Sequence, residues 1–445
     1  MLLARNPAVI GDGADSPDAA QVHRTRKLIL ASAVGTVVEW YDFFLFGLIA
    51  PLVFDQLFFP KLDPVAGTIA VYATFAVGFA SRPLGGIFFG HFGDRIGRKS
   101  MMLVTLLLMG VATVLMGLLP TYQQIGLSAA YLLAALRFLQ GFALGGESTA
   151  AGLLVIENAA AQKRRGLMGA IVQAAGPVGV LLASLSALLI TLLSREQLLD
   201  WGWRLPFLVS AVLVLIGLYV RANLDESMAF TIAQPRRRNV GWPAIEALGK
   251  HRKAILVVLL ASITESTFFY LTGIYSISFV TKVLGLGREI VTTAIVLANL
   301  LALITVPLYG ALSDRIGRKR VFMAGIIGAA AYLYLFFGLL EMRQPALIIL
   351  AIVLAVGLIH PLMFAMQSSF YPELFPTGVR FSGVSIGKQL GIVLGGGLAP
   401  MIATALLART NGDAFVIPIY YSLVCAITFW VLLATRETRS VDITQ

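Results

Sequence analysis

The sequence contains little charge and almost no cysteine. Charged residues make up 13% of the 445 residues, against 58% hydrophobic residues. Because soluble domains carry roughly 25% charged residues, this composition excludes an ordinary soluble protein and indicates a membrane protein. The single cysteine, Cys425, excludes an intrachain disulfide. Residues 1–27 lack an apolar core bounded by a cleavage site, so we interpret them as a polar tail rather than a signal peptide.

The motifs of several catalytic classes are also missing. The sequence has no Gly-x-x-x-x-Gly-Lys-Ser/Thr phosphate loop, which excludes the usual ATP-driven mechanism. It shows neither the spacing of a metal-ligand set nor a nucleophile with its base and orienting residue. We therefore expect a protein that is not an enzyme and that needs no cofactor or metal.

Long apolar runs are what the sequence has in abundance. A membrane-spanning helix needs about 20 predominantly apolar residues. The runs are unbroken, without the alternating segments of roughly ten residues that form membrane barrels, so we expect helices. The twelve predicted spans are residues 28–54, 67–92, 100–119, 127–158, 166–193, 204–222, 254–281, 289–312, 321–340, 346–371, 381–408 and 414–435.

The basic residues, which give a net charge of +11, are unevenly distributed between the spans. When the connecting segments are assigned alternately to the two sides, most Lys and Arg residues fall on the side of the N-terminus. Examples are the runs at 163–165, 236–238 and 318–320. The positive-inside rule then places both termini in the cytoplasm. The basic excess reflects topology, and we expect a lipid bilayer but no nucleic acid as partner.

The two halves of the chain repeat each other. The stretch "GHFGDRIGRK" at 90–99 agrees in seven of ten letters with "GALSDRIGRK" at 310–319. "ENAAAQKR" at 157–164 and "ELFPTGVR" at 373–380 share their acid-to-Arg spacing. Two parallel six-helix repeats are typical of transporters, with the substrate site near the midplane between the halves. The predicted divisions are a cytoplasmic tail at 1–27, a six-helix bundle at 28–222, a cytoplasmic linker at 223–253, a second bundle at 254–435 and a cytoplasmic tail at 436–445.

These motifs carry a family resemblance. The pattern Gly-x-x-x-Asp-Arg-x-Gly-Arg-Lys, present in both halves, resembles the major facilitator superfamily. The stretches "EWYDFFLFG", "RFLQGFALGGE", "WGWRLPF" and "ELFPTGVR" are similar to its metabolite:proton symporter branch, whose members carry shikimate, 2-oxoglutarate, citrate or betaine-type solutes. The resemblance implies an all-α membrane protein of twelve helices in two pseudo-symmetric bundles. It also implies alternating access in a bacterial inner membrane, and we expect a monomer.

The two decapeptides are predicted to close the cytoplasmic side. Asp94 can accept hydrogen bonds from a helix N-terminus of the opposite half, and the basic residues can bind carboxylates at neighbouring helix ends. The alternative is that they are only positive-inside anchors, although anchors need no fixed Asp and Gly spacing. The predicted gate residues are Asp94, Arg95, Arg98, Glu157, Arg164, Asp314, Arg315, Arg318, Glu373 and Arg380.

Charged residues inside the apolar spans mark the predicted site. A charge at the bilayer centre costs roughly 2.5–3.5 kcal/mol even on lenient scales, so each needs a partner or a watery cavity. Arg82 is a candidate partner for a carboxylate of the first span, and a static ion pair between helices is the alternative interpretation. The seven charged residues well within the spans are Glu39, Asp42, Arg82, Arg137, Glu147, Glu265 and Lys388.

We predict that some of these charged residues bind protons and that others bind the substrate. The proton affinity of a carboxylate changes with burial and with a nearby Arg, as proton coupling requires. We predict Glu39 and Asp42, which are three residues apart on one face, as the coupling site, with Glu147 as second choice. His360 is interpreted as a structural hydrogen bonder, with proton carriage as the alternative. The predicted substrate-binding residues are Tyr41, Arg82, Arg137, Gln140, Gln173, Glu265, Tyr270, Lys388 and Gln389.

Three functions are open from the sequence. The leading hypothesis is proton-coupled uptake of a small organic acid, shikimate-like or dicarboxylate-like, gripped by Arg137 with Lys388 as a second contact. Uptake of a zwitterionic osmolyte such as betaine or proline is the second. Drug efflux by antiport is the third, and the stretch "GPVGVL" lacks part of the glycine pattern that it would need.

Overall fold

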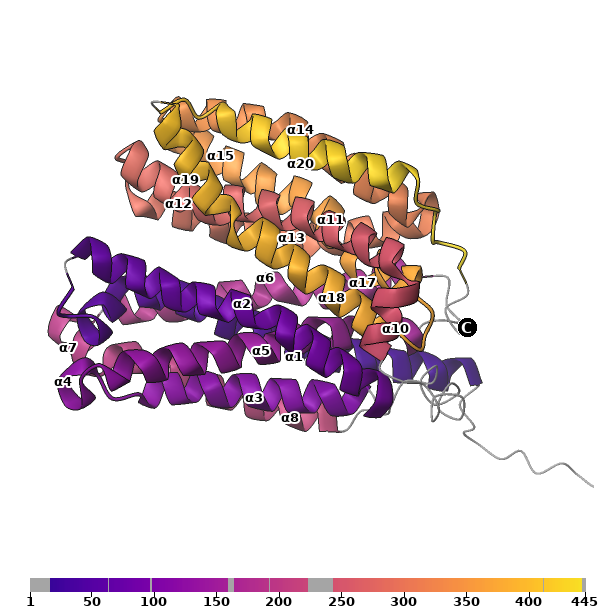
Figure 1. Ribbon diagram of the computed structural model, residues 1–445, viewed down its shortest axis with the longest axis horizontal. Coiled ribbons are helices and arrows are strands. Elements are labelled where there is room, and N and C mark those ends of the chain that lie inside the picture. The colour runs from indigo at the N-terminus through magenta and orange to yellow at the C-terminus, as the bar shows by residue number, and fades with distance from the viewer. Residues whose placement is uncertain are drawn as a thin grey trace, which may run out of the picture.

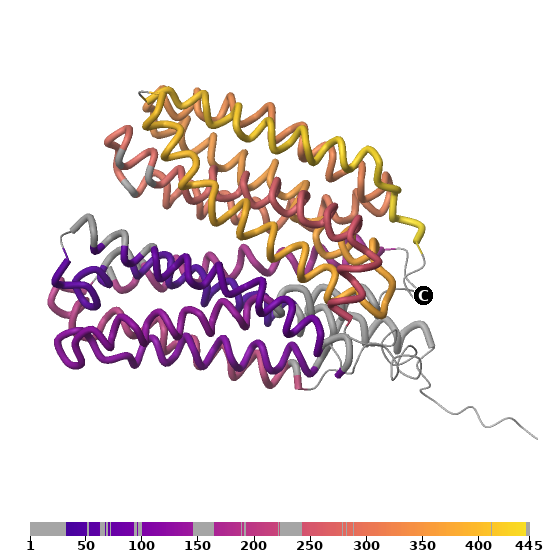
Figure 2. The backbone as a smooth tube through the Cα atoms, in the orientation of Figure 1, coloured from indigo at the N-terminus to yellow at the C-terminus, as the bar shows by residue number. Residues whose placement is uncertain are grey.

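The computed structural model describes residues 17–62, 64–96, 98–158, 164–191, 193–222, 243–410 and 412–441. Within these residues the regular structure is entirely helical. The helices form two bundles, one from each half of the sequence, which lie side by side with their long axes roughly aligned (Figure 1). The smooth backbone trace shows the same division, with the indigo and magenta half against the orange and yellow half (Figure 2). The predicted all-α, two-bundle fold is confirmed.

The first bundle contains, in the described residues, six long helices with short helical segments between some of them. Its elements are α1 (Pro17–Phe58), α2 (Pro64–Ile96), α3 (Arg98–Leu118), α4 (Tyr122–Ile125), α5 (Ser128–Asn158), α6 (Arg165–Thr191), α7 (Arg195–Asp200), η1 (Gly202–Arg204) and α8 (Leu205–Ala222).

The second bundle has the same order of spans but more interruptions. Its elements are α10 (Pro243–Lys250), α11 (Arg252–Phe269), η2 (Tyr270–Tyr275), α12 (Ser276–Ser278), η3 (Phe279–Val283), α13 (Arg288–Ile316), α14 (Arg318–Glu341), α15 (Pro345–Leu354), η4 (Ala355–Ile359), α16 (His360–Phe364), α17 (Gln367–Phe370), η5 (Pro372–Leu374), α18 (Arg380–Ile392), η6 (Val393–Gly397), α19 (Ala399–Arg409) and α20 (Val416–Leu433).

Length and hydropathy support the predicted spans. In the described part of the chain, 11 helical stretches are long and apolar enough to cross a membrane. The remaining predicted span corresponds to α2, a helix of 33 residues that carries Arg82 and the first decapeptide. At 1.5 Å per residue, α2 is about 50 Å long and also exceeds the thickness of a bilayer. Twelve spans therefore fit the structure.

Three predicted spans of the second half are not continuous α-helices. The spans at 254–281, 346–371 and 381–408 contain π-helical turns, which are η2 and η3, η4, and η6 respectively. π-Helical turns inside α-helices occur frequently at functional sites. The apolar pattern does not reveal them, because one extra residue in a turn leaves the composition of a buried helix unchanged.

Glycines allow α2 and α5 to pack with their backbones in contact. A Cβ atom on Gly141 would lie 1.9 Å from the carbonyl oxygen of Gly78, and one on Gly145 would lie 2.2 Å from that of Arg82. Small residues at such crossings are typical of membrane helix pairs, where dispersion contacts replace the hydrophobic effect. This contact holds Arg82 at a fixed depth in the bundle.

The bundles meet along α2 with α18 and along α6 with α13. A Cβ atom on Gly166 would lie 2.6 Å from the carbonyl oxygen of Gly310, so α6 and α13 touch at their predicted cytoplasmic ends. Gly90 of α2 similarly faces the backbone of Ser382 in α18. In Figure 1 the bundles converge toward the end where α10 and α17 lie. The two halves are therefore packed together at the predicted cytoplasmic side.

The Gly141 contact gives a testable prediction. Gly141→Ala should destabilise the protein, because the added methyl group collides with a backbone oxygen that cannot rotate away. Overpacking of this kind costs about 1–3 kcal/mol. We expect a lower Tm and less monodisperse protein in detergent. Gly338→Ala is the matched control, since a Cβ atom there meets nothing within 4 Å. Equal Tm values for the two variants would contradict the packing argument.

Candidate functional site

A cavity lies between the two bundles. Small-molecule sites are typically concave and mostly apolar, with a few polar groups, and the wall of this cavity has that composition. Both halves contribute to its wall. The lining residues are Glu39, Trp40, Phe43, Phe44, Arg82, Leu144, Gln173, Glu265, Ser266, Phe269, Tyr270, His360, Phe364, Gln367, Lys388, Gln389 and Ile392.

Charged side chains from four helices face this cavity. Glu39 and Arg82 come from α1 and α2, and Glu265 and Lys388 come from α11 and α18. Each of the four is no more than 7% exposed. The Arg82 guanidinium is attracted by Glu39, and the Lys388 ammonium is attracted by both Glu39 and Glu265. When these four side chains are ionised, the cavity therefore holds two cations and two carboxylates, and the opposite charges among them attract one another.

His360 adds a fifth polar group beside Glu265. Its Nε2 atom lies 2.6 Å from the Oε1 atom of Glu265, and both side chains are buried. The imidazole ring contacts the rings of Phe269 and Phe364, with centroid distances of 5.0 and 5.1 Å. α16 begins at His360, directly after the π-helical turn η4. The sequence interpretation of His360 as a hydrogen bonder fits this contact. The partner of His360 is, however, a group that can itself bind a proton, the carboxylate of Glu265.

Aromatic rings surround the charges and cross between the halves. The Arg82 guanidinium lies 4.2 Å above the ring of Phe43. Phe79 of α2 contacts Tyr270 at 5.7 Å between centroids. Both residues are farther from the predicted cytoplasmic end of their helices than Arg82 and Glu265 are. This pair therefore narrows the cavity on the predicted outer side.

Arg137 lies behind the cavity wall rather than in it. Its side chain is 1% exposed and is not among the lining residues. The guanidinium lies 4.1 Å above the ring of Phe46 and donates to the side-chain oxygen of Gln140. Gln140 in turn donates to Thr113 of α3. The sequence predicts that Arg137 grips the substrate with Lys388 as a second contact, but in the described conformation Arg137 does not line the cavity, and Arg82 is the cation opposite Lys388.

Asp42 and Tyr41 also point into the first bundle. One oxygen of Asp42 accepts a hydrogen bond of 2.6 Å from Ser210 of α8. The other, Oδ2, has no hydrogen-bond partner among the residues that the structure describes. The Tyr41 hydroxyl donates to the carbonyl oxygen of Pro206. Only Glu39 of the two predicted helix 1 carboxylates lines the cavity, because a three-residue step rotates Asp42 by about 60° around the helix axis.

Two glutamines, one from each half, occupy equivalent places in the cavity wall. Gln173 of α6 and Gln389 of α18 both line the cavity. The Gln389 amide donates to the carbonyl oxygen of Gly145 in α5, at 3.1 Å. Six of the nine predicted substrate residues thus line the cavity. They are Arg82, Gln173, Glu265, Tyr270, Lys388 and Gln389.

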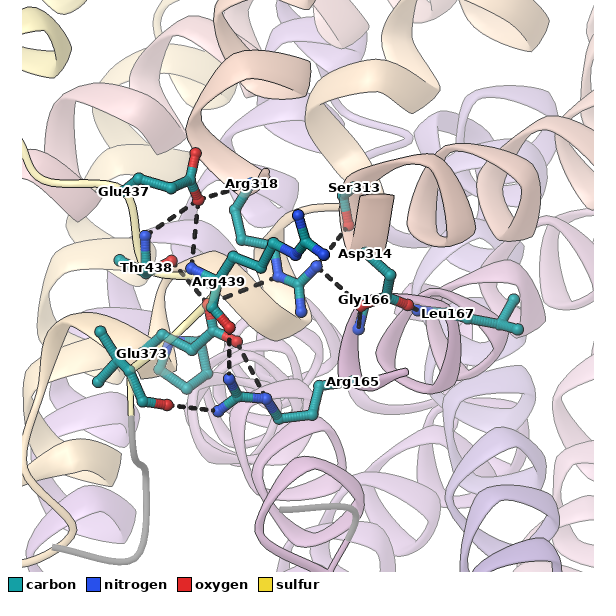
Figure 3. Close-up of polar contacts among 12 residues, drawn as sticks. Arg165, Gly166, Leu167, Ser313, Asp314, Arg318, Glu373, Glu437, Thr438 and Arg439 are labelled. Atoms are coloured by element: carbon teal, nitrogen blue, oxygen red, sulfur yellow. Dashed lines mark hydrogen bonds and ion pairs between the residues drawn. The ribbon is translucent and has the colours of Figure 1, made fainter. Parts of the chain in front are cut away.

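A second polar assembly, the inter-half cluster, lies at the predicted cytoplasmic end. It comprises Arg165, Asp314, Arg318, Glu373, Glu437, Thr438 and Arg439 (Figure 3). Asp314, at the end of α13, accepts hydrogen bonds from the backbone N–H groups of Gly166 and Leu167, both at 2.9 Å. These groups form the N-terminus of α6 in the other half. A carboxylate at a helix N-terminus is stabilised by unpaired N–H groups and by the helix dipole.

Glu373 lies at the centre of the cluster. Arg318 of the same half and Arg165 of the other half each approach it to 3.6 Å. The Thr438 hydroxyl donates to its Oε2 atom at 2.6 Å. Burial raises the pKa of the Glu373 carboxyl above its ordinary value, while Arg318, Thr438 and Arg165 counteract the rise. The buried carboxylate therefore depends on partners from both halves.

Residues from the C-terminal segment complete the cluster. The Arg165 guanidinium donates to the backbone carbonyl oxygens of Arg439 and Val441, at 2.8 and 3.0 Å. Glu437 accepts a bond of 2.8 Å from the backbone N–H of Arg318, at the start of α14. Figure 3 shows these residues converging from separate parts of the chain. The predicted tail at 436–445 is thus partly an element of the interface between the halves.

The predicted gate residues divide into four groups. Asp314, Arg318 and Glu373 lie in the cluster, whereas Arg164 and Arg315 have exposed side chains. Arg165, which the sequence interpretation missed, takes the place expected for its neighbour Arg164. Arg380 is buried and donates to the carbonyl oxygens of Pro372 and Phe375. The side chains of Asp94, Arg95, Arg98, Glu147 and Glu157 lie outside the part of the chain that the structure describes.

Some lining residues carried no sequence signal of their own. Trp40, Phe43 and Phe44 stand next to Glu39 in an apolar span, where aromatic residues more often only pack. The repeat offset identified Gln173 and Gln389, and the intramembrane charges identified Arg82, Glu265 and Lys388. Among the described residues no group of three His, Cys, Asp or Glu side chains could hold a metal ion.

Comparison with known proteins agrees with this architecture. Residues 28–241 match the family described as Sugar (and other) transporter, and residues 255–445 match the Major Facilitator Superfamily. The chain is similar to a solved structure of the proton:xylose symporter XylE, with a TM-score of 0.78 at 16% identity, over 95% of this chain and 99% of that one. At that identity the likeness shows the fold.

Curated relatives are similar over nearly the whole chain. The shikimate transporter of Escherichia coli (strain K12) is 38% identical, over 94% of this chain and 95% of its own. The inner membrane metabolite transport protein YhjE of the same organism is 39% identical, over 94% and 96%. A glycine betaine/proline/ectoine/pipecolic acid transporter, OusA of Dickeya dadantii (strain 3937), is 34% identical, over 91% and 81%. The chain is a multi-pass membrane transporter that belongs to the major facilitator superfamily.

Proposed function

We propose that this transporter takes up a small organic acid together with protons, by alternating access. The observation that carries the proposal is the charge balance of the cavity, where Arg82 and Lys388 face Glu39 and Glu265. An entering carboxylate must compete with a protein carboxylate for a cation. Since an uncompensated charge in the membrane interior is costly, the entering negative charge favours the uptake of a proton.

Glu39 is the proposed site of that proton. It lines the cavity and attracts both Arg82 and Lys388. Protonation of Glu39 removes this attraction and leaves the two cations available to the substrate. Arg82 can hold a carboxylate through two parallel hydrogen bonds, whereas Lys388 acts as a point charge. Asp42 is buried behind the cavity wall, and its Oδ2 atom has no hydrogen-bond partner among the described residues. It is the second carboxylate of α1 that can bind a proton.

The inter-half cluster is the proposed cytoplasmic gate. Its ion pairs and hydrogen bonds join α6 to α13 and to the C-terminal segment. These contacts exist only while the halves are together at this end, so they stabilise the closed arrangement and break on opening. The orientation, with this end and both termini in the cytoplasm of a bacterial inner membrane, follows from the positive-inside pattern. A monomer contains the complete site.

Transport of a zwitterion is the second candidate. Trp40, Phe43, Phe44 and Phe269 line the cavity, and aromatic faces attract quaternary ammonium groups. A cavity with both cations and carboxylates also suits a betaine. Relatives that are named proline/betaine transporters are 30–34% identical to this chain, and those named shikimate or metabolite transporters are similar over more of their own length.

Removing the proposed proton site should weaken coupling. Glu39→Gln is expected to lower the accumulation of acid under a pH gradient of one unit at least about tenfold while retaining exchange of labelled for unlabelled substrate, because the amide imitates the protonated carboxyl group. The measurement is uptake into proteoliposomes, with Asp42→Asn tested alongside. If Glu39→Gln still concentrates the acid as the unchanged protein does, Glu39 is not the coupling site.

Substitution of the cavity cations should reveal the substrate class. Arg82→Lys keeps the charge but loses the bidentate geometry, so we expect KM for a carboxylate substrate to rise about tenfold. Lys388→Met should impair a dicarboxylate more than a monocarboxylate. The assay is a panel of shikimate, 2-oxoglutarate, citrate, betaine and proline. Good transport of betaine by the unchanged protein and by Lys388→Met would contradict the organic-acid proposal.

Loss of the Asp314 acceptor should open the cytoplasmic side. Charge-assisted hydrogen bonds contribute about 1.5–3 kcal/mol, so Asp314→Asn should raise the open population at least about tenfold. The reporter is Leu144→Cys in the cavity wall, labelled by impermeant maleimide from each side. Cys425 is buried and gives little background. Asp413→Asn, at an exposed loop position, is the control. Identical labelling in all three proteins would exclude the gate role.

A further inference from the structure

We propose that His360 and Glu265 form a second proton-binding site, which controls the availability of Lys388 for the substrate. The inference rests on the proposed function and adds a proton to it. It starts from geometry: Nε2 of His360 lies 2.6 Å from Oε1 of Glu265, inside the wall of the cavity. At this separation the two groups share a proton, and a further proton converts the contact into an imidazolium–carboxylate pair.

Aromatic rings beside His360 can accommodate a positive charge on its imidazole. Its ring plane lies at 26° to that of Phe364 and at 37° to that of Phe269. The faces of aromatic rings are negative, so a cation stacked on such a face is stabilised even in an apolar setting. A histidine held only as a packing residue would need neither the short contact with Glu265 nor a place on the cavity wall.

Glu265 serves two groups that can carry positive charge. His360 binds it directly, and Lys388 is attracted by it across the cavity. When His360 is neutral, the Glu265 charge is available to Lys388. When His360 is protonated, that charge is neutralised at short range, and Lys388 can bind a substrate carboxylate instead. By linkage, the bound anion then strengthens proton binding at the pair.

Other ionisable groups near the pair do not replace this role. Glu39 and Arg82 balance each other on the opposite wall and act on Lys388. Three tyrosines also interact with Glu265: Tyr270 of η2, Tyr371 before η5 and Tyr421 of α20. Phenols are neutral at physiological pH. Histidine is the side chain type that can gain and lose a proton near physiological pH, and His360 is in direct contact with Glu265.

Proton stoichiometry tests the proposal. Proteoliposomes with the membrane potential clamped at zero and a gradient of one pH unit are loaded with labelled shikimate or with the best acid of the panel. Each coupled proton supports about a tenfold substrate gradient under these conditions, since one pH unit corresponds to about 1.4 kcal/mol. The unchanged protein, with Glu39 and the His360 pair, should reach about 100-fold accumulation. His360→Gln, which keeps a hydrogen-bonding side chain, should reach about tenfold.

Controls separate this inference from the proposed function. His251→Gln removes a histidine at the start of α11, outside the cavity, and should accumulate substrate like the unchanged protein. Glu265→Gln is the second variant and should lose the same proton as His360→Gln. Counterflow exchange confirms that each variant is folded. Equal accumulation by His360→Gln, Glu265→Gln and the unchanged protein would overturn the second site alone. Uncoupled transport by the unchanged protein would overturn the proposed function as well.

Discussion

The arrangement depends on one constraint, the cost of holding full charges inside a membrane. Each ion buried away from water costs several kcal/mol unless an opposite charge compensates it. In this protein the compensation crosses the interface between the halves, because Lys388 of the second half faces Glu39 of the first. The helix contacts between the halves, α2 with α18 and α6 with α13, maintain that register. A substrate site then follows, since charges balanced across a cavity can exchange partners.

The cost of burying charge also constrains the predicted cytoplasmic end of the molecule. In the cavity, the partner of a cation can be a solute. In the inter-half cluster, the partners of Asp314 and Glu373 are backbone N–H groups and guanidinium groups of the opposite bundle and the C-terminal segment. In the proposed mechanism the charges of the cavity respond to the bound substrate, and those of the cluster respond to the separation of the halves. The alternating access that we propose requires both responses.

The sequence predicted the fold and its two halves, because apolar runs and repeat offsets each have a direct physical cause. It also predicted that Asp94 of the first decapeptide accepts hydrogen bonds from a helix N-terminus of the opposite half, and the structure shows such a contact for its repeat counterpart, Asp314. It did not assign the exact side chains. Neighbouring positions on a helix differ by about 100°, so Arg164 was predicted where Arg165 binds. Arg137 was predicted to bind substrate together with Arg82, but its guanidinium contacts Phe46 and Gln140 inside the first bundle. Periodicity defines a face but not the helix that packs against it.

The π-helical turns make the two halves mechanically unequal. In the described residues such turns occur in the second half only, at η2, η3, η4 and η6, and three of these segments directly adjoin lining residues. A π-helical turn replaces the regular hydrogen-bond ladder by a wider one, so a helix bends there more easily than elsewhere. The half that holds His360, Glu265 and Lys388 therefore has π-helical bending points that the described helices of the first bundle do not share. The two halves repeat in sequence, but in the described residues they differ in the regularity of their helices.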